Sequence, residues 1–210
     1  MLLIKVAVAG ATGLVGGLLL RRLLDDPEVS SVIAPTRRAL PPHPKLSNPI
    51  TTGGGWPVLP PIDEAYGCLG TTRAAAGSDE AFRAVDFDLA VSFARASKAA
   101  GARRFGLISS IGADAHSRFL YPRTKAEAEA AASGLGFENV AIVRPAFLLG
   151  ERPIARRELA GELTRVLAPL MLGPLRRWRP VQADAVASSL ISALRGRVPG
   201  ALILESDAIH

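Results

Sequence analysis

Short apolar runs alternate with longer amphipathic stretches along most of this chain. The apolar runs predict strands at residues 2–9, 29–34, 65–69, 104–109, 140–143 and 201–204. Apolar positions at helical spacing predict helices at 12–25, 79–100, 121–132, 156–171 and 183–194. The proline- and glycine-rich stretch 40–61 is predicted to be irregular surface, with at most a short strand near Ile50. Because near-continuous apolar strands alternate with helices, we expect an α/β fold: a doubly wound parallel sheet, or Rossmann fold.

Length and composition limit the organisation of the chain. With 210 residues, 49% of them apolar, we expect a single domain, with residues 150–180 forming a small C-terminal cover on the substrate side. No run approaches the ~20 apolar residues that span a bilayer. The first apolar run lacks a basic leader and is interpreted as a strand rather than a signal peptide. The single cysteine, Cys68, cannot form an internal disulfide, which favours a reducing compartment, and we expect a cytoplasmic protein.

The charge balance is basic, with 25 Lys and Arg against 19 Asp and Glu. These charges are spread along the chain, and the densest cluster, residues 176–179, is short. We therefore expect either a solvated basic face or attraction for a phosphorylated cofactor and an acidic substrate, rather than binding to nucleic acid or membranes. The three histidines lack the spacing of metal ligands, so no metal site is predicted. The partner we expect is a small-molecule substrate, with the protein acting as a monomer or homodimer.

A glycine turn joins the first predicted strand to the first predicted helix, with the spacing Gly10-x-x-Gly13-x-x-Gly16. In such a turn Gly10 allows the sharp bend, Gly13 lets a pyrophosphate approach the backbone, and Gly16 lets the helix pack on the strand. The amides and partial positive charge of a helix N-terminus favour phosphate. A strand before the turn and an apolar helix after it are the context that this motif requires. The turn therefore predicts a dinucleotide site.

The end of the second predicted strand indicates which dinucleotide is preferred. Proteins that bind NAD usually carry an acidic residue there, which binds the ribose 2′-hydroxyl. This chain has no carboxylate at that place, where residues 34–38 end in Arg37 and Arg38. Guanidinium groups bind a 2′-phosphate through charge-assisted, bidentate hydrogen bonds. We therefore predict that NADP(H) is preferred over NAD(H).

Tyr121 and Lys125 are one turn apart and share a face of a predicted helix. A tyrosine hydroxyl ordinarily gives up its proton only near pH ~10, and a neighbouring ammonium favours the phenolate, which makes the phenol a usable general acid or base. Upstream, Ser109 and Ser110 lie at a predicted strand end, where ligands bind in open parallel sheets. A serine at that place could orient a substrate oxygen.

These motifs together resemble the atypical branch of the short-chain dehydrogenase/reductase superfamily. Further segments are similar to the Tat-interacting-protein oxidoreductase group and its bacterial relatives: Cys68-Leu-Gly-Thr-Thr-Arg73, Phe82-x-x-Val85-Asp86, Ser109-Ser110-Ile-Gly112-Ala-Asp114 and Arg144-Pro145. The similarity extends to about residue 195. It implies NADP(H) binding by the glycine turn and hydride transfer, with Tyr121 as general acid/base, Lys125 as its electrostatic partner and ribose ligand, and Ser110 as the orienting donor. Ser109 is the competing assignment for that serine.

The predicted cofactor contacts follow the strand ends. They are Gly10, Thr12, Gly13, Leu14, Val15, Gly16, Arg37, Arg38, Leu69, Gly70, Thr71, Thr72, Tyr121, Lys125 and Pro145. The resemblance assigns Asp86 a structural role between helix and sheet. It places Arg144 beside the nicotinamide, and a structural ion pair is the alternative for this arginine.

The function expected is NADP(H)-dependent oxidation or reduction of a small alcohol or carbonyl compound. One alternative within the same fold is an epimerase or dehydratase that uses its cofactor transiently. The other is a cofactor-binding regulatory protein that senses redox state without turnover. The tyrosine and lysine pair favours catalysis, because a sensor needs no acid/base group.

Overall fold

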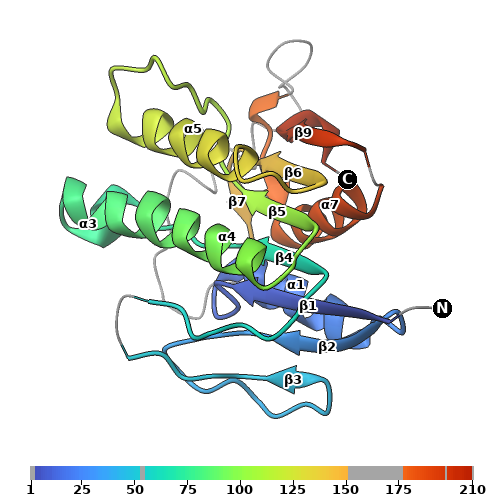
Figure 1. The fold of residues 1–210 in the computed structure, drawn as a ribbon. Coiled ribbons are helices and arrows are strands. Elements are labelled where there is room, and N and C mark those ends of the chain that lie inside the picture. Colours follow the sequence, from blue (N-terminus) through green and yellow to red (C-terminus); the bar gives the residue numbers. More distant parts are fainter. Residues whose placement is uncertain (1–2, 53–54, 151–176, 197, 210) are drawn as a thin grey trace.

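A seven-stranded sheet forms the centre of the molecule (Figure 1). The computed structural model describes residues 3–52, 55–150, 177–196 and 198–209. The strands lie in the order β3-β2-β1-β4-β5-β6-β9, and each neighbouring pair is parallel. Their bounds are β1 Ile4–Ala9, β2 Val29–Ile33, β3 Leu46–Ser47, β4 Glu64–Gly67, β5 Arg104–Ile108, β6 Asn139–Arg144 and β9 Gly200–Glu205. The predicted doubly wound parallel sheet is confirmed.

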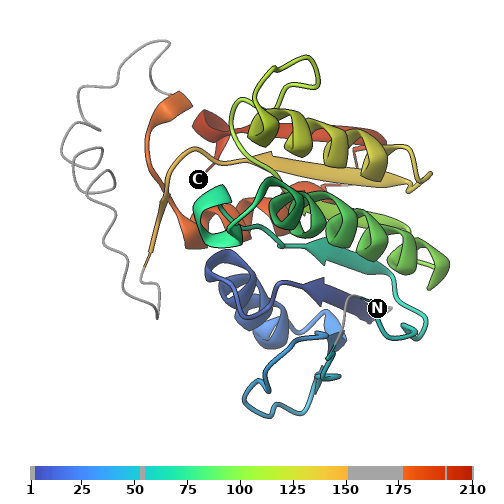
Figure 2. The ribbon, with the colours of Figure 1, turned by 90° about the vertical axis from the view of Figure 1, so that its left-hand side faces the viewer.

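Helices cover both faces of this sheet. Figures 1 and 2 show α4 (Ala90–Ala99) and α5 (Leu120–Ser133) on one face, with α1 (Leu14–Asp25) and α7 (Ala183–Arg195) on the other. Alternate residues of β1 serve the two layers: Val6 and Val8 pack with α1 and α7, whereas Ala7 and Ala9 pack on the opposite side. The central strands β1, β4, β5 and β6 are therefore largely buried on both faces, which is why they lack polar alternation in the sequence.

The smaller elements lie outside this framework. A second, two-stranded parallel sheet pairs β7 (Leu148–Leu149) with β8 (Val181–Gln182). Two short helices follow β4 and β9, namely α2 (Arg73–Ala76) and the 3₁₀ turn Ser206–Ala208. In the stretch predicted as irregular, the structure has β3 and an isolated bridge between Thr36 and Ile50. The helix predicted at 156–171 and most of the predicted cover lie outside the described residues.

The helix predicted at 79–100 is interrupted. It consists of α3 (Asp79–Arg83), a π-helical segment (Ala84–Leu89) and α4. The apolar spacing of the sequence does not reveal this change. A π turn contains one more residue than an α turn, but apolar residues still recur at roughly helical intervals along the chain. Such π segments occur frequently at functional sites, and this one carries the buried Asp86.

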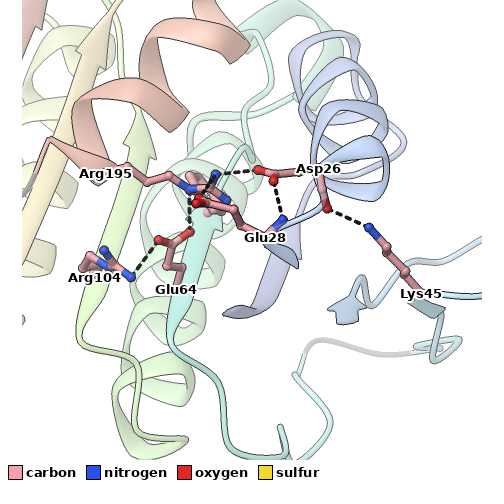
Figure 3. Close-up of polar contacts among 7 residues, drawn as sticks. Asp26, Glu28, Lys45, Glu64, Arg104 and Arg195 are labelled. Atoms are coloured by element: carbon pink, nitrogen blue, oxygen red, sulfur yellow. Dashed lines mark hydrogen bonds and ion pairs between the residues drawn. The ribbon is translucent and has the colours of Figure 1, made fainter. Parts of the chain in front are cut away.

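An ionic network closes the amino ends of β4 and β5, opposite the edge where the glycine turn lies (Figure 3). Glu64, which is fully buried, contacts Arg104 at 3.0 Å and Arg195 at 3.5 Å, and accepts a hydrogen bond from the Tyr66 hydroxyl at 2.9 Å. Arg195 also pairs with Asp26 at 2.5 Å. The network ties the end of α7 to the sheet and to the turn between α1 and β2.

Within the residues that the structure describes, none of the helices combines the length and apolarity needed to cross a bilayer. No group of acidic, histidine or cysteine side chains in that same part of the chain could hold a metal ion.

Candidate dinucleotide and substrate site

The site is positioned by the point where the strand order reverses. Strand β1 lies between β2 and β4. After β1 the chain builds the sheet outward through β2 and β3 on one side, and after β4 it builds outward through β5 and β6 on the other. In open parallel sheets, ligands bind in the crevice outside the carboxyl ends of the strands at this point. Ala9 and Gly67, which end β1 and β4, are register partners. The glycine turn and the segment 68–72 therefore flank the crevice.

The turn after β1 is so tight that two of its positions exclude any side chain. Gly10 has φ of +80°, and a Cβ there would lie 2.4 Å from the Cys68 carbonyl oxygen. A Cβ on Gly16 would lie 2.1 Å from the Gly10 carbonyl oxygen. Both obstacles are backbone atoms, which have no rotamer to change. The two glycines thus bring the first turn of α1 against the end of β1.

The N-terminus of α1 presents free backbone donors to the crevice. The helix begins at Leu14 with Gly13 as its N-cap, two residues later than predicted, and no side chain caps it. Amides without a capping side chain, next to a turn without Cβ atoms, suit a pyrophosphate. Thr12 is exposed, whereas the Val15 side chain is buried in the core, so Val15 could contact a ligand through its backbone alone. These features fit a dinucleotide.

Arg37 and Arg38 lie in the loop after β2, and both side chains are exposed. No ion pair engages either guanidinium in the described part of the chain, whereas the nearby Lys45 donates to the Asp26 carbonyl oxygen at 2.7 Å. The two arginines are therefore available to an anion beside the β2 end of the crevice.

A buried ion pair lies beneath the segment that follows β4. Lys125 of α5 contacts Asp86 at 2.6 Å between Nζ and Oδ1, with side chains 7% and 0% exposed. The other carboxylate oxygen of Asp86 accepts a hydrogen bond from the Thr71 amide at 2.8 Å. A Cβ on Gly70 would lie 3.6 Å from both Lys125 Nζ and Asp86 Oδ1. Gly70 therefore lies next to both groups of the ion pair and places no side chain against them.

Tyr121 lies one turn before Lys125 and packs against the same neighbouring helix. Its ring stacks on Phe82 at 5.4 Å between centroids. Phe82 and Asp86 are four residues apart, as are Tyr121 and Lys125, so the two helices meet through an aromatic pair and this ion pair, and Arg83 and Glu127 add a second ion pair. The structure joins Lys125 to Asp86, and no hydrogen bond between Lys125 and the Tyr121 hydroxyl occurs in these described residues.

The two serines after β5 differ in exposure. Ser109 is buried, its amide donates to the Val143 carbonyl oxygen, and its hydroxyl lacks a partner among the described residues. Ser110 is half-buried, and its hydroxyl makes one weak contact with the Ile111 carbonyl oxygen at 3.4 Å. Of the two hydroxyls, that of Ser110 is the more open to a ligand.

Other predicted contacts have structural partners. Thr72 is the N-cap of α2, where its hydroxyl accepts from the Ala75 amide. The Pro145 carbonyl oxygen accepts from the Ile111 amide, which ties the ends of β5 and β6 together. Arg144 makes a bidentate pair with Glu129 and a further pair with Glu205, and these carboxylates raise its pKa against the opposing effect of burial. Arg144 therefore has the structural role.

Cys68 lies beside the glycine turn but is not a nucleophile. Burial raises the pKa of its thiol to about 12, so the thiol is protonated at physiological pH. Its amide donates to the Ala9 carbonyl oxygen at 3.0 Å, which joins the ends of β1 and β4.

Asn48, which the sequence did not single out, braces the loop that carries Arg37 and Arg38. It lies just after β3 in the proline-rich stretch, where no periodicity distinguishes one polar residue from another. The one sequence feature that could have identified Asn48 is its place between a strand and a loop. There the side-chain amide of an asparagine can both donate hydrogen bonds to backbone carbonyls and accept them from backbone amides.

The fold is one that solved NAD-binding proteins and a short-chain dehydrogenase family protein share. The structure resembles MoeE5 in complex with UDP-glucose and NAD, with a TM-score of 0.70, 20% identity and coverage of 95% of this chain and 75% of that one. It also resembles a short chain dehydrogenase family protein from Francisella tularensis, with a TM-score of 0.68 at 12% identity and 98% coverage of both chains. UDP-N-acetylglucosamine 4-epimerase from Bacillus cereus gives a TM-score of 0.67 at 17% identity, over 96% of this chain and 79% of that one.

The particular family follows from sequence. The chain is 37% identical to the protein fmp52, mitochondrial, of Emericella nidulans, over 93% of this chain and 91% of the relative. It is also 37% identical to FMP52 of Candida albicans, over 69% of this chain and 67% of that protein. The chain belongs to the Fmp52 family. No family model matches the sequence.

These relatives correct one expectation. Their names place them in mitochondria, so the prediction of a cytoplasmic protein is wrong. It rested on the single cysteine, and cysteine content reports the redox state of a compartment rather than which compartment it is. Targeting is instead read from an address segment by receptors.

Proposed function

We propose that this protein is an NADP(H)-dependent oxidoreductase that acts on a small carbonyl compound or alcohol. The observation that carries the proposal is the buried Lys125 ammonium, fixed by Asp86 at the carboxyl edge of the sheet next to Gly70. A lysine fixed in this way by a buried carboxylate lies at the edge where ligands of open parallel sheets bind, which makes it a candidate ligand group. NAD in complexes of the structural neighbours supports a nicotinamide dinucleotide for this chain.

Each residue would have a separate task. The amides at the start of α1 would bind the pyrophosphate, and Lys125 would donate to a ribose hydroxyl. The cofactor, when bound, supplies or accepts hydride. Tyr121 would donate the proton that a reduced carbonyl oxygen requires, or take it up in the reverse direction. Ser110 would donate a hydrogen bond that orients the same oxygen.

The preference for the phosphorylated cofactor is supported by the loop after β2. Arg37 and Arg38 are exposed and free of ion pairs among the described residues, and the segment 34–38 holds no carboxylate to bind a 2′-hydroxyl. A 2′-phosphate would find two guanidinium groups at that place.

The experiment that tests the function is a panel of small aldehydes and ketones with NADPH and NADH in parallel, on wild type and Tyr121→Phe. We expect turnover with NADPH above that with NADH. Tyr121→Phe is expected to lose about 10²- to 10⁴-fold in kcat, since the positioned acid is lost, while the variant still binds NADPH. Phe keeps the ring that stacks on Phe82, so the substitution isolates the hydroxyl.

The alternative is a regulatory protein that binds the cofactor without turnover. Tight NADPH binding to wild type, with no substrate consumed anywhere in the panel, would favour it. An epimerase or dehydratase would instead convert its substrate with no net change in NADPH absorbance, so product analysis of the same reactions separates that alternative.

A further inference from the structure

We propose that Asn48 is a positioning residue that sets the preference for a 2′-phosphorylated nucleotide, by bracing the loop that carries Arg37 and Arg38. The inference rests on the proposed NADP(H) preference. It assigns a part in that preference to Asn48, which contacts neither arginine side chain. Its basis is a chain of hydrogen bonds from β3 back to the end of β2.

The side chain of Asn48 spans the loop. Its Nδ2 donates to the Ala34 carbonyl oxygen at 2.6 Å and to Thr36 Oγ1 at 2.8 Å. Its Oδ1 accepts from the Leu40 amide at 2.9 Å. One half-buried amide thereby joins the two ends of the segment 34–40, in which Arg37, Arg38 and Ala39 are exposed.

Thr36 carries the connection to the arginines. It is 6% exposed, and its hydroxyl, which accepts from Asn48, donates to the Arg38 carbonyl oxygen at 2.6 Å. Its own backbone accepts from the Thr51 amide and pairs with Ile50. The Arg38 carbonyl is thus held through one hydroxyl that Asn48 orients.

Backbone hydrogen bonds also hold the start of this loop, where the Ala34 amide donates to the Ser47 carbonyl oxygen and the Thr36 amide to the Pro49 carbonyl oxygen. Strand β3 has two residues, and the segment between Arg38 and Leu46 contains Pro41, Pro42 and Pro44, which donate no backbone hydrogen bonds. Without Asn48 the Ala34 carbonyl and the Leu40 amide would lose this partner, and the arginines would have to be ordered when the ligand binds. That ordering would weaken binding of the ligand that uses the arginines, and not of one lacking the 2′-phosphate.

The experiment measures the Kd of 2′,5′-ADP and of 5′-AMP by calorimetry, for wild type, Asn48→Ala and Ser47→Ala. These probes differ by the 2′-phosphate and need no turnover. We expect wild type to bind 2′,5′-ADP more tightly. Asn48→Ala should reduce that advantage about tenfold, because the loop and its arginine side chains must then be ordered when the 2′-phosphate binds, with the Kd of 5′-AMP unchanged. Ser47→Ala is the control, because Ser47 is adjacent and exposed and its side chain forms no hydrogen bond within the described residues.

Two further variants separate positioning from general loosening. Thr36→Val removes the hydroxyl that carries the connection and should reduce the same ratio. In a protein that already carries Arg37→Ala and Arg38→Ala, Asn48→Ala should have no further effect on the ratio, because it acts through those side chains. Thermal unfolding of each variant shows that it is folded at the temperature of the titration.

The outcomes distinguish the two proposals. Equal binding of the two probes by wild type ends the NADP(H) preference, and the inference with it. A wild-type preference that Asn48→Ala leaves intact, or an equal loss for both probes, overturns the role of Asn48 while the preference stands. The role of Asn48 is supported if Asn48→Ala lowers the preference for 2′,5′-ADP in the wild-type background and has no effect on it in the protein that carries Arg37→Ala and Arg38→Ala.

Discussion

At the scale of single residues, the main feature is how Lys125 is neutralised. Its ammonium is buried, and burying an unpaired charge is costly. Asp86 offsets that cost from the π-helical segment of the neighbouring helix. The lysine therefore keeps a fixed place at the carboxyl edge, and Asp86 also holds the Thr71 amide above it. One carboxylate thus fixes both the cation and the backbone of the segment that follows β4.

We predict that Asp86→Asn destabilises the protein by about 3 kcal/mol, because removing one partner of a buried pair leaves an uncompensated charge. Asp88→Asn, two residues away on an exposed side chain, is the control and should cost less than about 0.5 kcal/mol. Urea unfolding at neutral pH measures both values. Equal stability of the two variants would show that the ion pair contributes nothing.

At the scale of elements, the joint between β1 and α1 combines packing with binding. The same absence of side chains that lets α1 approach the strand leaves its first amides open. α1 is also joined to α7 on the same face, where Arg22 pairs with Asp184 of the first turn of α7 at 2.5 Å. Both of these side chains are about half exposed, so the pair contributes little stability, and apolar packing holds the two helices together.

We predict opposite effects for two adjacent substitutions in α1. Gly16→Ala would place a Cβ 2.1 Å from the Gly10 carbonyl oxygen, so it should cost about 2 kcal/mol or more and weaken binding of 2′,5′-ADP. Gly17→Ala would place a Cβ 3.4 Å from the Ala11 carbonyl oxygen, an ordinary contact, and should stabilise the helix by up to about 1 kcal/mol.

Urea unfolding and the nucleotide titration would be carried out on both variants. A Gly16→Ala protein as stable as Gly17→Ala would show that the turn can relax, and that the close approach of α1 is not required.

At the scale of the whole molecule, the two edges of the sheet have separate tasks. The carboxyl edge carries the glycine turn and the Lys125 pair, whereas the amino edge is closed by Glu64, Arg104 and Arg195 (Figure 3). Burial raises the pKa of the Tyr66 hydroxyl in this network, and the Glu64 charge raises it further. Tyr66 therefore remains a neutral donor to Glu64. This edge is built for stability, and it anchors the last long helix.

Asp26 gives this network a pH dependence. Burial raises the pKa of its carboxyl, but the hydrogen bonds from Arg195 and the Glu28 amide, with the charges of Arg195 and Lys45, hold it below its ordinary value of 3.8 overall. A lowered pKa in the folded state means that the stabilisation is fully present above the unfolded value. It is lost as pH falls through the folded value.

We therefore predict that Asp26→Asn is less stable than wild type at pH ~7 and that the difference shrinks as pH falls below ~4. Asp25→Asn, on the exposed neighbour, should show no such dependence. Urea midpoints between pH ~7 and pH ~3 measure it. A difference that stays constant over that range would mean that Asp26 is not held by Arg195.

Much of the fold could be predicted from the sequence because it depends on local patterns. Apolar runs and helical spacing placed the six longer strands and the long helices of the described residues to within a few residues, but not β3, β7, β8 or α2. The glycine turn follows from three positions along seven residues. The basic character of the loop after β2 could also be predicted, because residues 34–38 contain two arginines and no acidic residue.

What only the tertiary structure decided are the partners. The Asp86 pair with Lys125, the structural role of Arg144 and the contact of Arg195 with Glu64, which are 131 residues apart, each join separate elements. The sequence determines which residues are able to form ion pairs or hydrogen bonds, because the charge and polarity of a side chain are set by its residue type. Which of them are paired depends on how the helices pack over the sheet, and on details such as a π turn that leave no trace in hydrophobic periodicity.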